Sequence, residues 1–575
     1  MNPPPWFDRS DLLAFLKKRV DGFQAGYRQN LALIGPSGRG KSTLIRKFLE
    51  EIPPASLLLP IYLEVGPEEN VSEWIFRFTR TVLYSVLRLT QTDVFPTRLP
   101  ELLEASGELV PRTAALCRRI VSWAESGRLD EAYEHLWELS HLLTLETGHR
   151  VLLVLDEFHR LRGFSLKEPF RSLGRRIMVQ PTTLYLVTSS EPAAAYAILR
   201  EGLALLFGKF ESIEVPPLGV AACRQAIRAV GSGDPMDPWV ESLLLDLAQG
   251  RPHRLNLLLE ALARHAQDSK PADPTRVLPD LLETLFLDPG SELRREFERR
   301  LRLLPAHRNR MFCLQLLEMI ASGVHRLPDL AEASQKPVSQ VVGALRLLEE
   351  ERLVKREGVF HRIPERLFQA WLITAHPTLQ GVALMGPAQA RAHFRRTADL
   401  WMERVRQSAH QPVEERVRRL LLEWRDERVE LDGRKVLLPK FREVEPVPGP
   451  LERQSLLGRP ATRQKRGWWV VPWTGALDEG QARQLAQQVR GFAPLKEYWK
   501  VLVGASPAEV NARLVLQEAK IRFWDRVALN HLLDLYGLER LPVPEETEEP
   551  SASMVPLEES PLSFGSEEQS SEVAG

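Results

Sequence analysis

A glycine-rich turn followed by a lysine and a serine constrains this chain more than any other feature. The apolar run Asn30–Ile34 precedes the turn, and residues 42–49 follow it with helical periodicity. Glycines let backbone N–H groups face phosphate oxygens, and the positive end of the next helix attracts the same anion. The turn matches the P-loop pattern G-x-x-x-x-G-K-[ST], and we expect all of its residues to bind ATP: Gly35, Pro36, Ser37, Gly38, Arg39, Gly40, Lys41, Ser42 and Thr43.

Two side chains of this turn have specific predicted roles. Lys41 is expected to reach the β- and γ-phosphates, and the Ser42 hydroxyl is expected to bind Mg²⁺. A glycine turn that only joins a strand to a helix would not explain this Lys-Ser pair.

Two carboxylates follow the apolar run at residues 151–155. Asp156 is predicted to hold the Mg²⁺ shell, because it stands where the strand leaves the sheet. Glu157 is predicted to polarise the attacking water as a general base. The alternative is a pair that only begins a surface turn. The P-loop upstream in the same αβ unit favours the catalytic interpretation.

A third buried strand, at residues 183–188, ends in hydroxyl groups. A polar side chain there is suited to contact the γ-phosphate or to orient water. Ser189 is the preferred residue and Thr188 the alternative. Capping of the next helix explains the same residues equally well.

Apolar strands alternate with helices over the first part of the chain, which predicts an α/β fold with a parallel sheet. Helices are expected at residues 10–24, capped by Ser10 or Asp11, at 164–179, and three times between residues 71 and 145. A purely helical lid follows to about residue 299. Strands are expected at residues 30–34, 57–65, 150–155, 183–188 and 212–215.

Basic residues outside the P-loop are further candidates for the nucleotide. Arg254 lies in a basic turn that opens a lid helix and is suited to close over the phosphates. Arg175 and Arg176 are candidate arginine fingers from a neighbouring subunit. For Arg254, the alternative is an ordinary helix N-terminus that follows a glycine C-cap. For Arg175 and Arg176, the alternative is a solvated helix face.

The next unit has the element order of a winged helix-turn-helix. Helices at residues 311–320, 327–333 and 338–351 precede a hairpin at 352–362 with Gly358 at its tip. This order predicts binding to double-stranded DNA. Binding to a protein is the alternative, and it is favoured by Glu349, Glu350 and Glu351, whose negative charges repel DNA phosphates. The candidate DNA contacts are Ser339, Gln340 and Arg346 on the long helix, and Lys336, Arg352, Lys355, Arg356, His361 and Arg362 around it.

Composition limits the kinds of site, compartment and partner that the chain is expected to have. The three cysteines are far apart with no CxxC pair, which argues against a local zinc site or disulfides and fits the cytoplasm. No apolar run approaches the roughly 18 residues of a membrane helix, so no membrane partner is expected. Residues 541–575 carry nine Glu and no Lys, Arg or Asp, so the preceding 540 residues carry a formal excess of nine positive charges. That tail is expected to be disordered.

With these residues in view, the chain resembles the AAA+/STAND group of P-loop ATPases, and within it the archaeal-type ATPases related to origin-recognition proteins. The resemblance implies that Pro252 lies beside the base, and that self-assembly completes the site with arginines in trans. The residues that carry it are Phe7-Asp8-Arg9, Asp156-Glu157-Phe158, Val215-Pro216-Pro217-Leu218, Gly250-Arg251-Pro252 and Phe360-His361-Arg362-Ile363-Pro364.

In the archaeal-type group a nuclease-like domain often follows the winged helix. Residues from Trp499 to Leu533 resemble the last strands and helix of Mrr-type nucleases of the PD-(D/E)xK fold. The stretch expected to hold Glu-x-Lys reads Trp468-Trp469-Val470-Val471-Pro472-Trp473, so the domain is predicted to be inactive, since metal-dependent cleavage needs carboxylates. Arg463, Lys465, Arg466 and Trp468 are suited to grip nucleic acid, and core packing is the alternative for the tryptophan.

The resulting fold prediction is a P-loop NTPase sheet with a helical lid, a winged helix-turn-helix and a restriction-endonuclease-like α/β domain. The predicted boundaries are 1–219 for the ATPase core, 220–304 for the lid, 305–380 for the winged helix, 381–540 for the nuclease-like domain and 541–575 for the tail. The predicted function is an ATP-hydrolysing switch in which the bound nucleotide controls binding to DNA or to a protein partner. The protein is also predicted to form a homo-oligomer as one possible assembly. The alternatives are a signalling scaffold without turnover, a DNA-cutting defence effector and a replication initiator.

Overall fold

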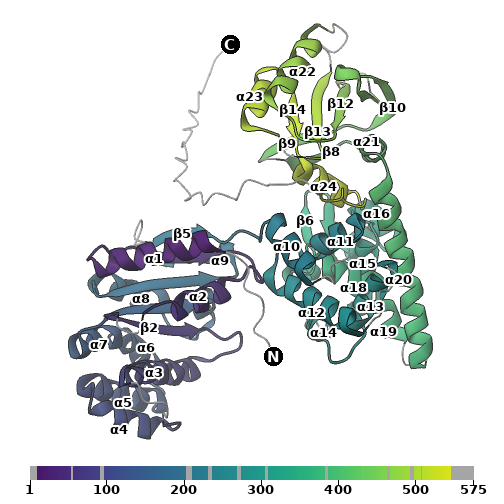
Figure 1. Cartoon of the computed structure of the whole chain (residues 1–575). Helices are drawn as coiled ribbons and strands as arrows, with labels where there is room; N and C mark the ends of the chain where they lie inside the picture. Colours follow the sequence, from purple (N-terminus) through teal and green to yellow (C-terminus); the bar gives the residue numbers. More distant parts are fainter. Residues whose placement is uncertain are drawn as a thin grey trace, which may run out of the picture. The chain divides into compact units, whose positions relative to one another are not determined.

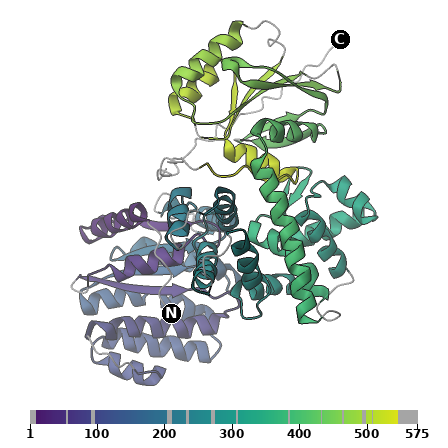
Figure 2. The same cartoon turned by 45° about the vertical axis from the view of Figure 1, so that its right-hand side comes forward.

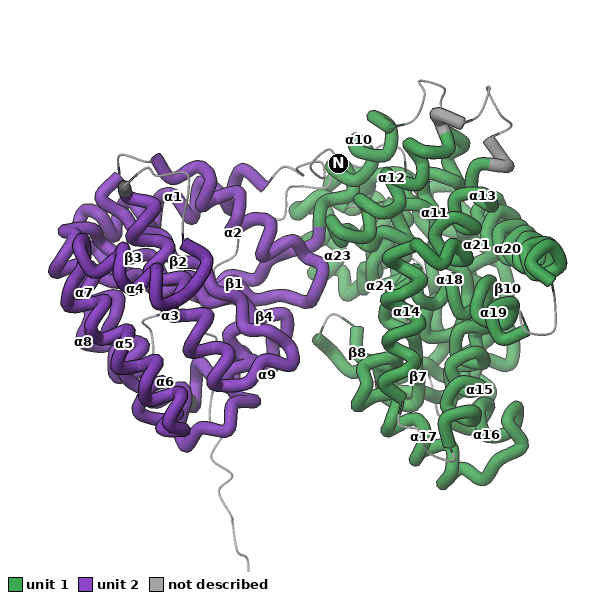
Figure 3. The backbone as a smooth tube through the Cα atoms, turned by 90° about the horizontal axis from the view of Figure 1, so that it is seen from below, with its two compact units in different colours: residues 1–5, 218–550 green, residues 6–217, 551–575 purple. Residues whose placement is uncertain are grey.

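The computed structural model describes residues 9–53, 56–90, 96–202, 210–230, 236–268, 274–304, 309–381, 386–431, 433–462, 466–491, 498–506 and 508–544. The chain divides into two compact units, which Figure 3 colours separately. We call them the N-terminal unit, built on Trp6–Pro217, and the C-terminal unit, built on Leu218–Pro550. Phe7, Asp8, Arg463, Lys465 and the acidic tail from residue 545 onward lie outside the described residues.

A five-stranded parallel sheet organises the N-terminal unit (Figure 1). The strand order is β2-β3-β4-β1-β5. This is the predicted α/β fold of a P-loop NTPase. Strands β1 to β4 are mostly apolar and buried, as expected for a parallel sheet covered on both faces, whereas only Ile213 is buried in the edge strand β5. The strands are β1 (Asn30–Ile34), β2 (Leu58–Glu64), β3 (Arg150–Asp156), β4 (Thr183–Ser189) and β5 (Phe210–Glu214).

Helices cover both faces of this sheet. Helices α1 (Ser10–Gln24) and α2 (Lys41–Glu50) pack on the face that carries Leu31 and Leu33. The opposite face, which carries Ala32 and Ile34, is covered by a larger group. That group comprises α3 (Val71–Leu87), α4 (Leu99–Gly107), α5 (Pro111–Glu125), α6 (Leu129–Leu136), α7 (Leu139–Thr147), α8 (Pro169–Val179) and α9 (Pro192–Ala197).

Two predictions for these helices were wrong. Residues 71–145 hold four complete helices and most of a fifth rather than three, because breaks fall where the sequence disfavours helix continuation. Pro111 begins α5, and Gly127 adopts a positive φ of 77° between α5 and α6. In addition, the N-cap of α1 is Arg9, without a side-chain capping hydrogen bond, and not Ser10 or Asp11.

The C-terminal unit begins with a helical region and continues into the segment predicted as a winged helix (Figure 2). The first helices are α10 (Val220–Val230), α11 (Pro238–Ala248), α12 (Pro252–Asp268), α13 (Pro274–Phe286) and α14 (Glu292–Arg302). Next come α15 (Arg310–Ala321), α16 (Leu327–Ser334), α17 (Val338–Glu350), β6 (Lys355–Glu357) and β7 (Phe360–Arg362). Three helices complete the region: α18 (Arg366–Thr374), α19 (His376–Gly381) and the long α20 (Pro387–His410), which packs on α13, α18 and α19.

A second sheet, of order β10-β11-β12-β13-β14, forms the last part of this unit. The strands β12, β13 and β14 are parallel, whereas β10 and β11 are antiparallel to their neighbours. Its strands are β10 (Phe441–Pro448), β11 (Gln454–Pro460), β12 (Trp468–Trp473), β13 (Trp499–Gly504) and β14 (Arg522–Trp524). Helices α21 (Val413–Leu422) and α24 (Arg526–Leu535) cover one face, and α22 (Glu479–Gly491) and α23 (Val510–Glu518) cover the other.

Several elements here were not predicted. The apolar pattern predicts a helix over residues 413–427 and a strand over 435–438. The helix α21 ends at Leu422, and Glu427 begins strand β8 (Glu427–Leu431), which pairs with β9 (Arg434–Leu438) at the expected strand. Strand β10 was missed because it contains Pro446 and Pro448, which are tolerated there since β10 is an edge strand.

The acidic tail was expected from residue 541, but the first four residues are packed. Leu541 is buried, and the Val543 N–H donates to the Ser242 Oγ at 2.8 Å. Residues 541–544 therefore belong to the C-terminal unit. Across the described ranges, none of the helices combines the length and apolar character that a bilayer crossing requires.

Candidate nucleotide-binding site

The predicted P-loop lies between β1 and α2, as the sequence indicated. Gly38 and Gly40 adopt positive φ angles of 78° and 84°, which glycine adopts without strain. The Gly35 N–H donates to the Ser189 carbonyl at 3.2 Å. A Cβ added at Gly35 would lie 3.2 Å from the Val215 carbonyl oxygen, so glycine allows this close approach of two backbones without a shift of either one.

Lys41 is buried within this loop. Its Nζ donates to the carbonyl oxygens of Gly35 at 2.7 Å and Pro36 at 3.2 Å. Burial lowers the pKa of Lys41, while Glu157 and Asp156 oppose that shift. Among the described residues, no carboxylate lies within ion-pair distance of this ammonium group. A buried cation whose partners are neutral carbonyls fits an anionic ligand.

Asp156 ends β3, and its side chain is fully buried. The Tyr62 hydroxyl donates to Oδ2 at 2.5 Å, and the Thr188 hydroxyl donates to Oδ1. Burial and the neighbouring Asp156 raise the pKa of Tyr62, so that hydroxyl stays a donor. Within the described part of the chain, no Lys or Arg forms an ion pair with Asp156. Its uncompensated charge is suited to a bound cation such as Mg²⁺.

Glu157 follows at a sharp turn, with a positive φ of 57°. Its Oε2 accepts hydrogen bonds from the Ser190 N–H at 3.1 Å and from the Ser190 Oγ at 2.6 Å. The Glu157 N–H donates to the Thr188 Oγ1 at 3.1 Å. The carboxylate is therefore held by the strand end of β4.

The three consecutive hydroxyl residues at the end of β4, Thr188, Ser189 and Ser190, have different partners. The Ser189 Oγ lies 3.0 Å from the His159 Nδ1 and accepts from the Glu191 N–H at 3.0 Å. Thr188 and Ser190 instead contact Asp156 and Glu157. Ser189 is the preferred sequence candidate, and its hydroxyl contacts His159, whose Nδ1 lies 3.4 Å from the Glu157 Oε2. Tyr62, His159 and Ser190 were not selected from the sequence, although the Thr-Ser-Ser run signalled a polar strand end.

Arg9 connects the P-loop to the last strand of the sheet. Its Nη2 donates to the carbonyl oxygens of Arg39 at 3.1 Å and Pro216 at 2.9 Å. This is the described part of the N-terminal Phe-Asp-Arg segment. The contact fixes the start of α1 against the loop.

Other predicted residues lie elsewhere. Arg176 forms an ion pair with Glu138, and Arg175 is exposed on α8. Pro252 is the first residue of α12 in the C-terminal unit. Arg254 is buried in that unit, where it bonds Glu296 at 2.6 and 2.7 Å and Glu365 at 2.6 Å. Arg254 therefore serves as an internal ion-pair partner.

Comparison with known proteins agrees with this geometry. Residues 5–187 match the AAA ATPase domain. The match includes the P-loop, Asp156, Glu157 and most of β4, so the N-terminal unit holds an AAA ATPase-type nucleotide-binding domain. No curated protein matches the sequence.

Several solved structures are similar to the chain at low identity. A Walker-type ATPase of Pyrococcus abyssi is 17% identical with a TM-score of 0.40, and the alignment covers 64% of this chain and 96% of that one. The ORC2 protein of Aeropyrum pernix is 14% identical with a TM-score of 0.39, covering 69% and 96%. The ORC1 protein of Aeropyrum pernix, in complex with DNA, is 17% identical with a TM-score of 0.38, covering 67% and 96%.

The predicted DNA contacts differ in accessibility. Ser339, Gln340 and Arg346 are exposed on α17, as are Lys336, Arg352 and Arg356 nearby. Lys355 and Arg362 both form ion pairs with Glu357, at 2.7 and 2.8 Å. Burial and Arg356 lower the pKa of His361 to about 4, so this residue is neutral at pH 7 and faces Glu349 at 3.3 Å. His361 is therefore a poor phosphate ligand.

Strand β12 is fully buried. Trp468 packs with Trp424 and Trp524 on one face of the sheet, and Trp469 and Trp473 pack on the other. Trp468 therefore belongs to the core rather than to a nucleic-acid surface. In the described ranges, no group of three or more His, Cys, Asp or Glu is placed to hold a metal ion.

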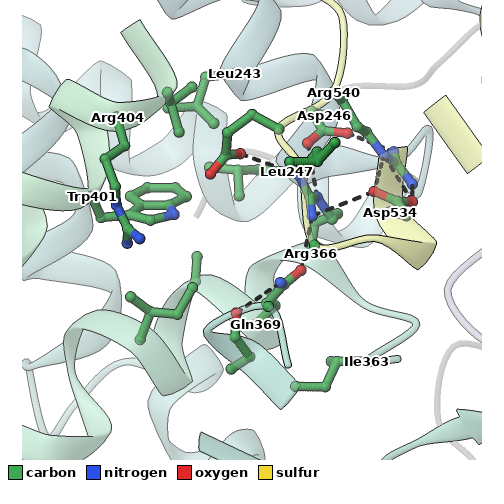
Figure 4. Close-up of a pocket in the computed structure, with 18 of the residues that line it drawn as sticks. Leu243, Asp246, Leu247, Ile363, Arg366, Gln369, Trp401, Arg404, Asp534 and Arg540 are labelled. Carbon is green, nitrogen blue, oxygen red and sulfur yellow. Dashed lines mark hydrogen bonds and ion pairs between the residues drawn. The ribbon is translucent and has the colours of Figure 1, made fainter. Parts of the chain in front are cut away.

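The C-terminal unit contains a pocket of about 90 Å³ that the sequence did not predict (Figure 4). Arg540 binds Asp246 of α11 at 2.6 Å and Asp534 of α24 at 2.5 Å, and Arg366 of α18 binds Asp246 at 2.9 Å. Trp401 and Arg404 line the pocket from α20. Burial would raise the pKa of Asp246, but Arg366 and Arg540 hold it below its usual range. The network joins the segment after α24 to helices far earlier in the chain.

Proposed function

We propose that the protein binds and hydrolyses ATP, and that its nucleotide state controls how the C-terminal unit binds double-stranded DNA or a protein partner. One observation carries the proposal. The P-loop after β1, the carboxylates at the end of β3 and the hydroxyls at the end of β4 lie together at the carboxyl ends of the strands, because these three strands are parallel neighbours.

Each residue has a proposed role. Lys41 Nζ exchanges the Gly35 and Pro36 carbonyls for phosphate oxygens of ATP. Glu157 takes a proton from the water that attacks the γ-phosphorus, as the bond to the β-phosphate oxygen breaks. Thr188 and Ser190 position the two carboxylates. Ser189 remains a predicted contributor through His159.

Mg²⁺ fits the same edge. Asp156 and the Ser42 hydroxyl would hold it, and when bound it supplies positive charge to the phosphates. The uncompensated charge of Asp156 supports this assignment, as does the half-buried position of Ser42 at the start of α2.

We propose that residues 309–368 act as a winged helix. The exposed Ser339, Gln340 and Arg346 on α17 support double-stranded DNA as the ligand, read in the major groove. Arg175 is exposed and is the proposed trans arginine of a homo-oligomer, whereas Arg176 is engaged by Glu138. The mixed sheet at residues 441–524 is proposed as a nuclease-like domain without cleavage activity, because β12 offers no carboxylate.

The decisive experiment measures ATP hydrolysis by the full chain, with and without duplex DNA, at low and moderate salt. We expect turnover that duplex DNA stimulates and that salt weakens, because phosphate contacts release counterions. Lys41→Ala should abolish turnover, and Glu157→Gln should retain bound ATP while turnover is lost. Steady turnover without any DNA effect would favour a protein partner. Unchanged turnover in Lys41→Ala would contradict the whole proposal.

A further inference from the structure

The second sheet exposes a tryptophan at one end. Among the tryptophans in the described ranges, only Trp499 is exposed, with 40% of its surface accessible. The Arg522 guanidinium lies 4.5 Å from the centre of its ring, and that of Arg466 lies 5.7 Å away. Both distances are within the range of cation–π interactions. The exposed indole is therefore flanked by two guanidinium groups.

The topology explains why these residues meet. Strands β12, β13 and β14 run parallel, so their amino ends lie at the same end of the sheet. Arg466 stands two residues before β12, Trp499 begins β13 and Arg522 begins β14. The β8–β9 hairpin adds Arg434, whose charge acts on Arg522. We call Arg434, Arg466, Trp499 and Arg522 the Trp499 edge.

The cations of the Trp499 edge lack carboxylate partners. In the described part of the chain, no Asp or Glu lies within ion-pair distance of Arg434, Arg466 or Arg522. Burial and the charge of Arg434 lower the pKa of Arg522. By contrast, Arg483 and Arg513 of the same domain pair with Glu479 and Asp525. The edge therefore holds uncompensated positive charge that an anionic ligand would neutralise.

A cleft lies beside the β6–β7 and β8–β9 hairpins. Gly433, the neighbour of Arg434, lines it together with the cations Lys355, Arg356 and Arg428 and the carboxylates Glu357 and Glu430. Arg356 and Arg428 also form no ion pair within the described residues. Arg356 and Arg428 are therefore two further cations available to an anionic ligand, on the cleft that Gly433 lines beside Arg434.

We propose that the Trp499 edge binds single-stranded nucleic acid. A base stacks on the exposed indole, while the guanidinium groups bind the flanking phosphates. A duplex would offer the phosphates but keep its base faces stacked, so the indole favours a single strand over a double one. An acidic peptide would satisfy the arginines alone and leave the indole without a matched partner. The proposal does not depend on ATP hydrolysis.

The test is fluorescence anisotropy of the full chain, without nucleotide, using labelled oligothymidylate and oligouridylate of about 20 nucleotides and a duplex of the same length. Trp499→Ala should weaken single-strand binding about fivefold or more, and Trp499→Phe should retain most of it. Arg466→Glu and Arg522→Glu should each reduce the slope of log affinity against log salt by about 0.7. Arg490→Glu, at an exposed residue of α22, is the matched control and should have no effect.

The outcomes separate the alternatives. Tighter binding of oligouridylate would support the proposal with RNA as the ligand, and equal binding would support it for either nucleic acid. Wild-type affinity in both Trp499→Ala and Arg522→Glu, with unchanged melting temperatures, would overturn it. Binding of a peptide of residues 545–575 in place of the oligonucleotides would overturn it in favour of an acidic segment. ATP turnover, measured in parallel, should remain normal in the edge variants, which distinguishes this proposal from the ATPase proposal.

Discussion

The Ser190 side chain donates a 2.6 Å hydrogen bond to Glu157 across the carboxyl ends of β4 and β3. The Ser190 N–H binds the same Oε2 at 3.1 Å, so the carboxylate has one fixed oxygen and one available oxygen. We expect Ser190→Ala to lower kcat about three- to tenfold with little change in KM, because Glu157 would orient water less well. Steady-state ATPase kinetics provide the measurement. A raised KM at normal kcat would instead assign Ser190 to substrate binding.

Thr188→Val should both destabilise the protein and slow hydrolysis. It removes a donor from Asp156 and an acceptor from the Glu157 N–H, and each buried polar group left alone costs about 1–3 kcal/mol. Thr183→Val is a matched control on the same strand, since the Thr183 Oγ1 is buried without a hydrogen-bond partner within the described residues. We expect that control to be neutral or stabilising in denaturant unfolding. Equal losses of stability in both variants would show that β4 tolerates neither substitution, and that the loss in Thr188→Val does not come from the contact with Asp156.

Arg254→Ala should destabilise the C-terminal unit by about 3 kcal/mol, because Glu296 and Glu365 would lose a buried partner. Arg300 still contacts both carboxylates, which limits the loss. Arg264→Ala, at an exposed position of the same helix, should change stability by less than about 0.5 kcal/mol. Urea unfolding of the full chain compares the two. Similar midpoints for both variants would contradict this role of Arg254.

Stability should fall at acid pH through the same network. Burial alone would raise the pKa of Glu296, but Arg254 and Arg300 lower it to about 2. The unfolded carboxyl titrates near 4.5, so the stabilisation is complete above that pH and is lost as pH falls toward 2. Thermal melts of the wild type and Glu296→Gln between pH 5 and 2.5 test this. The variant should be less stable at pH 5, and the difference should shrink as pH falls.

The parallel sheet was predictable because four of its five strands are largely apolar runs. The strand order was not, since pairing depends on long-range packing. Lys41, Asp156 and Glu157 follow from motif spacing. The choice between Thr188 and Ser189 depends on which side of the sheet each hydroxyl faces. That became evident only with the register that pairs Leu155 with Val187 and so places Thr188 beside Asp156.

Other features were hidden for different reasons. The buried network of Asp246, Arg366 and Arg540 joins residues that are far apart in sequence and have no local pattern. Strand β10 was disguised by two prolines that only an edge strand accepts. Trp499 and the tryptophans of β12 are the same residue type, and the sequence alone does not show which of them is exposed. Their positions in the sheet decide this: Trp499 is exposed, whereas the tryptophans of β12 are buried.

The contact between Asp246 and Arg540 also affects the order in which the two units can fold during synthesis of the chain. The two residues are 294 positions apart, which a ribosome covers in about 15 to 60 s. The residues of the N-terminal sheet have all been synthesised before Asp246 is, so that sheet can form early. Asp246 of helix α11, in contrast, can pair with Arg366 once 120 further residues have been made, but its second partner, Arg540, is available only when nearly the whole chain has emerged. A stalled or shortened chain would thus carry a finished nucleotide-binding unit beside an unfinished helical one.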